Sequence, residues 1–150
     1  FVLGGHGDSM VAMLGLTEVE GKKINELIKE GKIKKEKIDQ IIERTKKGGA
    51  EIVKYLEKGS AFYAPAASGV EMAQSYLQDL KKQLPCAAYL NGEYGVKDLY
   101  AGVPVVIGSG GVEKVVELEL NPQEKDNFEK SIQTVRDLFE NAQKIDPSLK

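Results

Sequence analysis

The order of helical and extended segments constrains the fold of this chain more than any other feature. Helical spacing of apolar residues appears at 34–58 and 64–83, extended segments follow between 87 and 120, and a third helix begins near 121. Regular alternation of strand and helix, which a doubly wound parallel sheet requires, is absent. The pattern therefore predicts an α+β domain, with mixed or antiparallel strands and three main helices.

The first two predicted helices carry local signals of their own. In 34–58 the apolar stripe consists of Ile38, Ile41, Ile42, Ile52, Val53 and Leu56. Gly48 and Gly49 interrupt it, and because each glycine costs about 1 kcal/mol in a helix relative to alanine, they predict a kink or a close backbone contact. In 64–83, Pro65 suits a first turn, and Met72, Tyr76 and Leu80 share a face.

The third helix has the clearest start signal in the chain. Asn121 can cap the helix, Pro122 suits its first position, and Glu124 completes a capping box. Its predicted buried stripe is Phe128, Ile132, Val135, Leu138 and Phe139.

Extended segments are predicted from alternation and from β-branched residues. The longer ones are 87–90, which runs into the turn signal Asn91-Gly92, 103–107 and 112–120. Shorter strands are predicted at 1–3, 11–14 and 18–20.

Composition excludes several classes of function. The 150 residues form a comfortable single domain, and a net charge of −2 gives no reason to expect nucleic acid as a partner. The longest apolar run, 103–107, is too short to span a membrane. A single cysteine, Cys86, cannot form an internal disulfide, which favours a cytoplasmic protein. One histidine and one cysteine offer no ligand spacing for a metal.

The only histidine, His6, lies among three glycines in the segment 4–11. Glycines leave room around the imidazole, and histidine is the residue type whose ordinary pKa, about 6.5, allows proton transfer near neutral pH. A catalytic role and an ordinary turn are both compatible with this pattern.

Resemblance to a known family favours catalysis. The segment Val2–Val11 resembles the catalytic-histidine segment of the malate and lactate dehydrogenases. Further matches follow in family order up to about residue 140, at 48–53, 59–68, 89–95, 102–108 and 110–113. The resemblance implies that residues 1–150 are the C-terminal substrate and catalytic domain. The N-terminal NAD-binding domain would then lie outside this chain, and the opening Phe1-Val2-Leu3 without methionine suggests a piece of something larger.

The same resemblance implies a reaction and a site. The parent protein would oxidise malate reversibly to oxaloacetate in the tricarboxylic acid cycle, with hydride transfer to NAD and His6 as proton acceptor and donor. Ala61 would face the substrate and Pro65 the cofactor, although core packing explains either residue equally well. No metal is implied, and family members are usually homo-oligomers.

The family's orienting aspartate and substrate arginines lie upstream of the histidine segment, so this chain alone is expected to be inactive. It also lacks a dinucleotide fingerprint, because Gly5-x-Gly7 is followed by Met10 and Gly108-x-Gly110 by Glu113. Gly7-Asp8-Ser9-Met10 is also similar to the nucleophile motif of the Gly-Asp-Ser esterases, in which a histidine near the C-terminus deprotonates the serine. The only histidine of this chain is His6, three residues from Ser9, so the sequence argues against an esterase. The remaining alternatives are a lactate or other 2-hydroxy-acid dehydrogenase domain, and a non-catalytic association domain.

Overall fold

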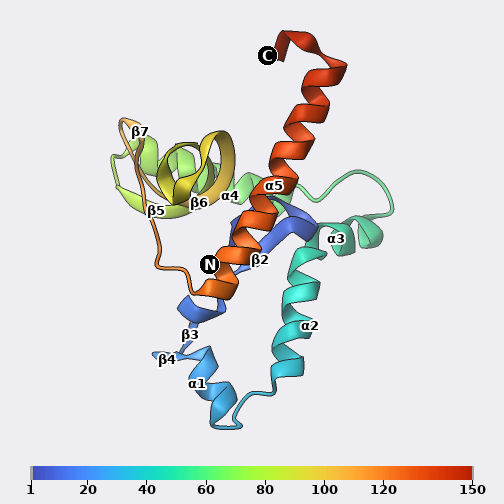
Figure 1. Cartoon of the computed structure of the whole chain (residues 1–150), viewed down its shortest axis with the longest axis vertical. Coiled ribbons are helices and arrows are strands. Elements are labelled where there is room, and N and C mark those ends of the chain that lie inside the picture. The colour runs from blue at the N-terminus through green and yellow to red at the C-terminus, as the bar shows by residue number, and fades with distance from the viewer. Residues whose placement is uncertain (1, 150) are drawn as a thin grey trace.

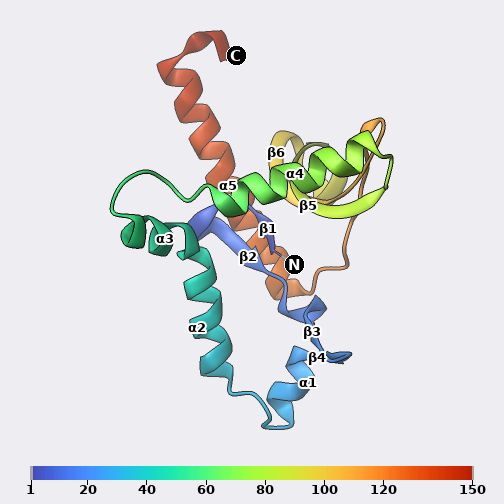
Figure 2. The ribbon, with the colours of Figure 1, turned by 180° about the vertical axis from the view of Figure 1, so that it is seen from behind.

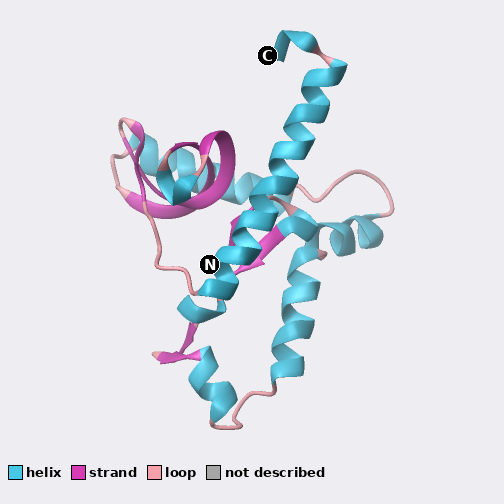
Figure 3. Cartoon of the chain, viewed as in Figure 1, coloured by secondary structure: helices cyan, strands magenta, loops and turns pink. Residues whose placement is uncertain are grey.

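The computed structural model describes residues 2–149. The strands are β1 (Val2–Gly4), β2 (Met10–Ala12), β3 (Glu18–Val19), β4 (Lys22–Lys23), β5 (Lys82–Asn91), β6 (Lys97–Gly108) and β7 (Gly111–Val115). The α-helices are α1 (Ile24–Lys29), α2 (Lys35–Lys46), α3 (Gly48–Leu56), α4 (Tyr63–Leu77) and α5 (Pro122–Ile145). Short 3-10 helices occur at η1 (Gly7–Ser9), η2 (Leu14–Leu16), η3 (Glu93–Gly95) and η4 (Pro147–Leu149). The α+β prediction is confirmed (Figure 3).

The main sheet is antiparallel and is built around β6. Its order is β2-β1-β6-β5, and β7 also pairs with β6. Where β1 meets β6, Gly4 lies opposite Gly102, and a Cβ at position 102 would be 2.7 Å from the Gly4 carbonyl oxygen. This close approach of two backbones fixes the point from which the His6 loop leaves the sheet.

Helix α5 packs across this sheet and begins as predicted. The Asn121 side chain accepts a hydrogen bond from Glu124 N at 2.9 Å, and the Glu124 carboxylate accepts one from Asn121 N at 3.1 Å, which completes the capping box. Phe128 and Ile132 then join the core of the sheet. Leu138 and Phe139 are exposed, so the predicted buried stripe ends half-way along the helix.

Helices α2, α3 and α4 form a second region, here named the limb. Figures 1 and 2 show α2 and α3 on the opposite side of α5 from β5, β6 and β7, with α4 crossing from one side to the other. The limb buries little: α2 buries Ile38, α3 buries no residue, and α4 buries only Ser75. The large apolar side chains that it exposes are Ile41, Ile52, Val53, Tyr55, Leu56, Tyr63, Val70, Met72, Tyr76 and Leu77.

Several predicted boundaries differ from the structure. The 34–58 helix is two helices, broken at Lys47 immediately before the two glycines. The 64–83 helix ends at Leu77, so Leu80 lies outside it, and residues from Lys82 onward belong to β5. The strand predicted over 112–120 ends at Val115, and α1 was not predicted. Asn91-Gly92 does turn the chain, but through a longer loop that contains η3.

Candidate functional site

His6 lies in the loop between β1 and η1, and its side chain is exposed. The next residue, Gly7, has a positive φ of 69°, and a Cβ added there would meet no atom within 4 Å. Open space thus adjoins the imidazole on this side, as the glycine pattern predicted.

The loop is attached to α5 through one buried hydroxyl group. Gly5 N donates to Ser131 Oγ at 2.8 Å, and Ser131 Oγ donates to the Ser9 carbonyl at 2.5 Å. Ser131 is only 4% exposed. One side chain therefore binds the backbone on both sides of His6.

Glycine is required in the loop for steric reasons as well. Gly4 has a positive φ of 88°, and a Cβ there would overlap Ser131 Oγ. A Cβ on Gly5 would overlap the hydroxyl of Ser9, which itself donates to the His6 carbonyl at 3.2 Å. The glycines thus allow the loop to lie directly against α5.

A cavity of about 450 Å³ lies beside His6, between β1, β5, β6 and the outer half of α5. Its lining is mainly apolar and includes Cys86, Tyr100 and Leu138. Burial raises the pKa of the Cys86 thiol, whose Sγ lies 3.3 Å from Met72 Sδ. A thiol held neutral in this way is a poor nucleophile. His6 is the lining residue of a type that can transfer protons near neutral pH.

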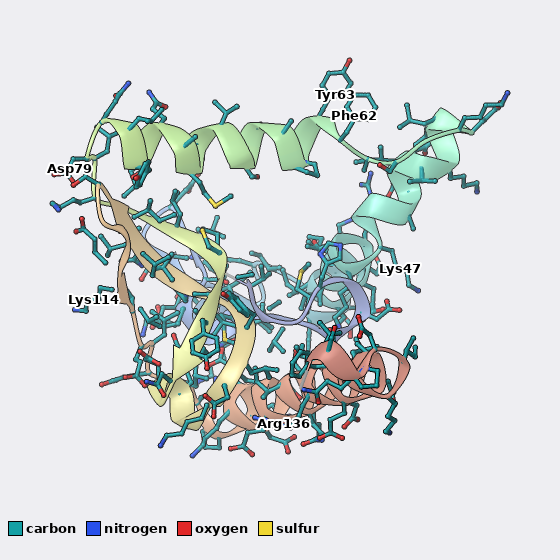
Figure 4. The ribbon with its side chains drawn as sticks, turned by 90° about the horizontal axis from the view of Figure 1, so that it is seen from above. Lys47, Phe62, Tyr63, Asp79, Lys114 and Arg136 are labelled. Carbon is teal, nitrogen blue, oxygen red and sulfur yellow. The ribbon has the colours of Figure 1, made fainter. Side chains whose placement is uncertain are left out.

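The other two predicted site residues lie in the limb. Ala61 is half-buried in the connection between α3 and α4, and Pro65 is exposed in the first turn of α4. Neither lines the cavity beside His6. Figure 4 shows Tyr63, also in that first turn, pointing outward from the molecule. Of the three predicted site residues, His6 alone therefore lines this cavity.

Sequence reasoning missed Ser131, although a signal was present. Ser131 lies on the apolar face of α5, beside Ile132 and one turn from Phe128 and Val135. A hydroxyl on a buried helix face requires a partner, because burying it without one is costly. The partner could not be read from the sequence, since it lies more than 120 positions away.

Within residues 2–149 no helix is long and apolar enough to cross a membrane. The same residues contain no group of three or more histidine, cysteine or acidic side chains arranged to hold a metal ion.

Comparison with known proteins assigns the fold to a family. Residues 1–145 match the family model described as lactate/malate dehydrogenase, alpha/beta C-terminal domain. The chain belongs to the lactate/malate dehydrogenase family. It is 61% identical over 148 residues to a malate dehydrogenase from Pelagibacter ubique (strain HTCC1062), covering 99% of this chain and 46% of that protein.

Solved structures agree with this assignment. A malate dehydrogenase from Cryptosporidium parvum is 46% identical, with a TM-score of 0.88 over 93% of this chain and 45% of that one. A lactate dehydrogenase from Eimeria maxima, solved with NADH and oxamate, is 41% identical, with a TM-score of 0.90 over 97% of this chain and 46% of that one. The chain spans about half the length of the relatives that it matches.

Proposed function

We propose that this chain is the C-terminal, substrate-side domain of an NAD-dependent malate dehydrogenase. The 61% identity to a malate dehydrogenase over 99% of the chain carries this proposal. The reaction is the reversible oxidation of malate to oxaloacetate, and it takes place in the full-length protein.

In this reaction His6 is the proton acceptor and donor. Its neutral imidazole takes the proton of the C2 hydroxyl of malate, and in the reverse direction the protonated ring returns that proton to the 2-oxo oxygen. A bound NAD would supply the acceptor for the hydride that leaves C2. The exposed ring of His6 and the open space at Gly7 support this role, because substrate can reach the imidazole directly.

The residues present fit the reactive end of the cofactor but not its nucleotide end. Pro65 is exposed and offers an apolar wall to the nicotinamide, and the small side chain of Ala61 leaves room for substrate. The chain contains no dinucleotide-binding glycine pattern. Most of the contacts with NAD are therefore assigned to an N-terminal domain of the same protein.

Lactate is the second candidate substrate. The TM-score of 0.90 with a lactate dehydrogenase supports it, since the two folds superpose as well as those of malate dehydrogenases do. Malate is preferred because the malate dehydrogenase from Pelagibacter ubique is considerably closer in sequence, at 61% identity against 41%.

The exposed apolar side chains of the limb support two further proposals. They contact the N-terminal domain and a second copy of the protein, which makes the enzyme a homo-oligomer. A reduced Cys86 is compatible with a cytoplasmic location.

The test replaces His6 in the full-length protein. His6→Asn keeps a hydrogen-bonding side chain but cannot carry the proton, so kcat for malate should fall by roughly 10²–10⁴-fold with little loss of NADH affinity. The matched control is Asp8→Asn, at an exposed position of the adjoining 3-10 helix η1, and this variant should retain most of its activity. A His6→Asn enzyme that kept more than about a tenth of its kcat would make His6 an ordinary turn residue.

Two further measurements accompany this test. The ratio of kcat/KM for malate to that for lactate separates the two substrate candidates. The 150-residue chain alone is expected to show neither turnover nor enhanced NADH fluorescence at micromolar concentration, and either signal would contradict the assignment of NAD binding to another domain.

A further inference from the structure

Ser131 lies on α5, far from His6 in sequence, yet it is the side chain that holds the His6 loop. Its hydroxyl accepts a hydrogen bond from Gly5 N at 2.8 Å and donates one to the Ser9 carbonyl at 2.5 Å, so it is both acceptor and donor. These two backbone groups flank His6 on either side. We propose that Ser131 is a positioning residue that sets the place and orientation of the His6 imidazole for proton transfer, an inference that rests on the proposed function.

The bonding of Ser131 differs from that of a typical serine within a helix. Such a hydroxyl commonly bonds to the carbonyl of its own helix four residues back, as the hydroxyl of Thr134 does with the Lys130 carbonyl. Ser131 instead directs its proton to the His6 loop. The apolar neighbours Ile132 and Phe128 are buried, so an alanine would suit this face if packing alone mattered.

The geometry around Ser131 leaves the loop few alternative positions. Gly4 passes so close that any Cβ there would overlap the serine hydroxyl, and a Cβ at Gly5 would come within 3.1 Å of Val135 Cγ2. The loop is therefore pressed against α5 and aligned by two hydrogen bonds. Because a displacement of about 1 Å can cost roughly 10²-fold in rate, such alignment bears directly on catalysis.

The chain supplies a matched control in Ser75. Its hydroxyl makes the same kind of bridge, since it donates to the Ile107 carbonyl at 2.7 Å and accepts from Lys82 N at 3.2 Å. Like Ser131 it is a buried serine on a helix, but it joins the end of α4 to the sheet. Ser131→Ala and Ser75→Ala therefore remove equivalent bonds, and only the first of them concerns His6.

The experiment compares Ser131→Ala, Ser75→Ala and Ser131→Cys in the full-length protein, below the unfolding temperature of each variant. We expect Ser131→Ala to lower kcat by about tenfold or more while KM for NAD stays within about twofold, because the displaced group acts in proton transfer and not in cofactor binding. Ser131→Cys, whose thiol is a weak donor and acceptor, should recover part of the loss. Ser75→Ala should keep the kcat of the unmodified protein, even if its melting temperature falls as far as that of Ser131→Ala.

A second readout does not depend on activity. Hydrogen exchange of the amides of residues 4–10 should accelerate in Ser131→Ala, because Gly5 N loses its acceptor, and should stay unchanged in Ser75→Ala. If exchange accelerates and kcat is unaltered, or if Ser75→Ala loses as much kcat, the positioning role is wrong. Failure of the proposed function would look different, because the unmodified protein would then turn over no 2-hydroxy acid while the exchange difference remained.

Discussion

The region around α5 and the limb differ in what their helices bury. Helix α5 buries Phe128, Ile132 and two polar side chains, Glu124 and Ser131, each with hydrogen-bond partners on the N-terminal segment. Helices α3 and α4 carry several large apolar side chains, yet together they bury only Ser75. The first half of α5 thus completes a core, whereas the limb has apolar surface that residues 2–149 leave exposed.

This difference indicates how the two parts of the proposed site are stabilised. The His6 loop depends on contacts that are all present within the chain, so its geometry should persist when the chain is isolated. Ala61 adjoins the limb and Pro65 lies in it. The apolar side chains of the limb are largely exposed in this chain and would be covered by the N-terminal domain and the second copy under the proposed function. The two regions therefore predict different responses to mutation.

The largest expected effect concerns association of the limb. We expect the 150-residue chain to self-associate with a dissociation constant of about 10 μM, equivalent to roughly 7 kcal/mol. Ile52→Lys places a charge on the exposed limb surface and should weaken association strongly. Val112→Lys, at a half-exposed apolar position on β7, should leave it unchanged.

Sedimentation equilibrium over a tenfold concentration range around 10 μM measures this effect. A single species of monomer mass throughout would show that the limb needs no partner. If Val112→Lys weakened self-association as much as Ile52→Lys does, the contact surface would include the sheet and not the limb alone.

The next effect concerns the core. Leu90 is fully buried in β5, so Leu90→Ala should destabilise the chain by about 2–5 kcal/mol. Leu77 is 77% exposed at the end of α4, so Leu77→Ala should lower the free energy of unfolding by less than about 0.5 kcal/mol. Urea unfolding measures both variants in the isolated chain and in the full-length protein. If Leu77→Ala destabilises the full-length protein more than the isolated chain, the side chain of Leu77 is covered in the full-length protein. If it destabilises both equally, the proposed covering of the limb is contradicted.

The sequence could predict features that depend on neighbouring residues, but not features that depend on contacts distant in sequence. The start of α5 was predictable because Asn121, Pro122 and Glu124 carry the whole signal within four residues. The end of α4 was not, because Leu80 continues the apolar spacing while Asp79 and Lys81 adopt positive φ angles of 51° and 52°. Those angles are supported by contacts with the distant hairpin at Ser109 and Glu113, which local sequence does not reveal.

The same limit applies to the strand predicted over 112–120 and to the candidate site. Val116 N still donates to the Pro104 carbonyl of β6 at 2.8 Å, but the Val116 carbonyl and Leu118 N bind the Tyr94 hydroxyl in place of a neighbouring strand. His6 was identified from local glycines and family resemblance, whereas Ser131 required knowledge of a contact across the chain.

A smaller effect is expected where Glu124 joins α5 to the N-terminal segment. Its carboxylate accepts from Gly15 N at 2.7 Å and from Asn121 N at 3.1 Å, and the residue is 6% exposed. Glu124→Gln points an amide N–H at one of these donors, so we expect a loss of about 1–3 kcal/mol. Glu129→Gln, at an exposed position of the same helix, should change stability by less than about 0.5 kcal/mol. Equal losses in urea unfolding would mean that the buried contacts of Glu124 contribute nothing.

The smallest effect is expected at the junction of α4 with the sheet, where Lys81 binds Asp79 at 3.1 Å and Glu113 at 2.8 Å. The Ser109 backbone N–H and the Lys81 ammonium lower the pKa of Asp79, and Lys81 together with the Gly110 N–H lowers the pKa of Glu113. Because both carboxyl groups have lower pKa values in the folded chain than in the unfolded chain, their contribution is present above the unfolded values. It is lost as the pH falls through the folded values.

Lys81→Met should therefore lower the Tm by no more than a few degrees at neutral pH, where the carboxylates are ionised. The difference from the unmodified chain should shrink near pH 3, as the carboxyl groups approach protonation. Lys114→Met is the matched control: within residues 2–149 its ammonium forms no ion pair, and it lies on the adjoining strand β7 (Figure 4). Thermal unfolding across pH 3–7 measures both variants. If the Tm difference for Lys81→Met stayed constant over this range, the lysine would act through packing of its aliphatic stem and not through its charge. Apolar contacts would then hold the junction together.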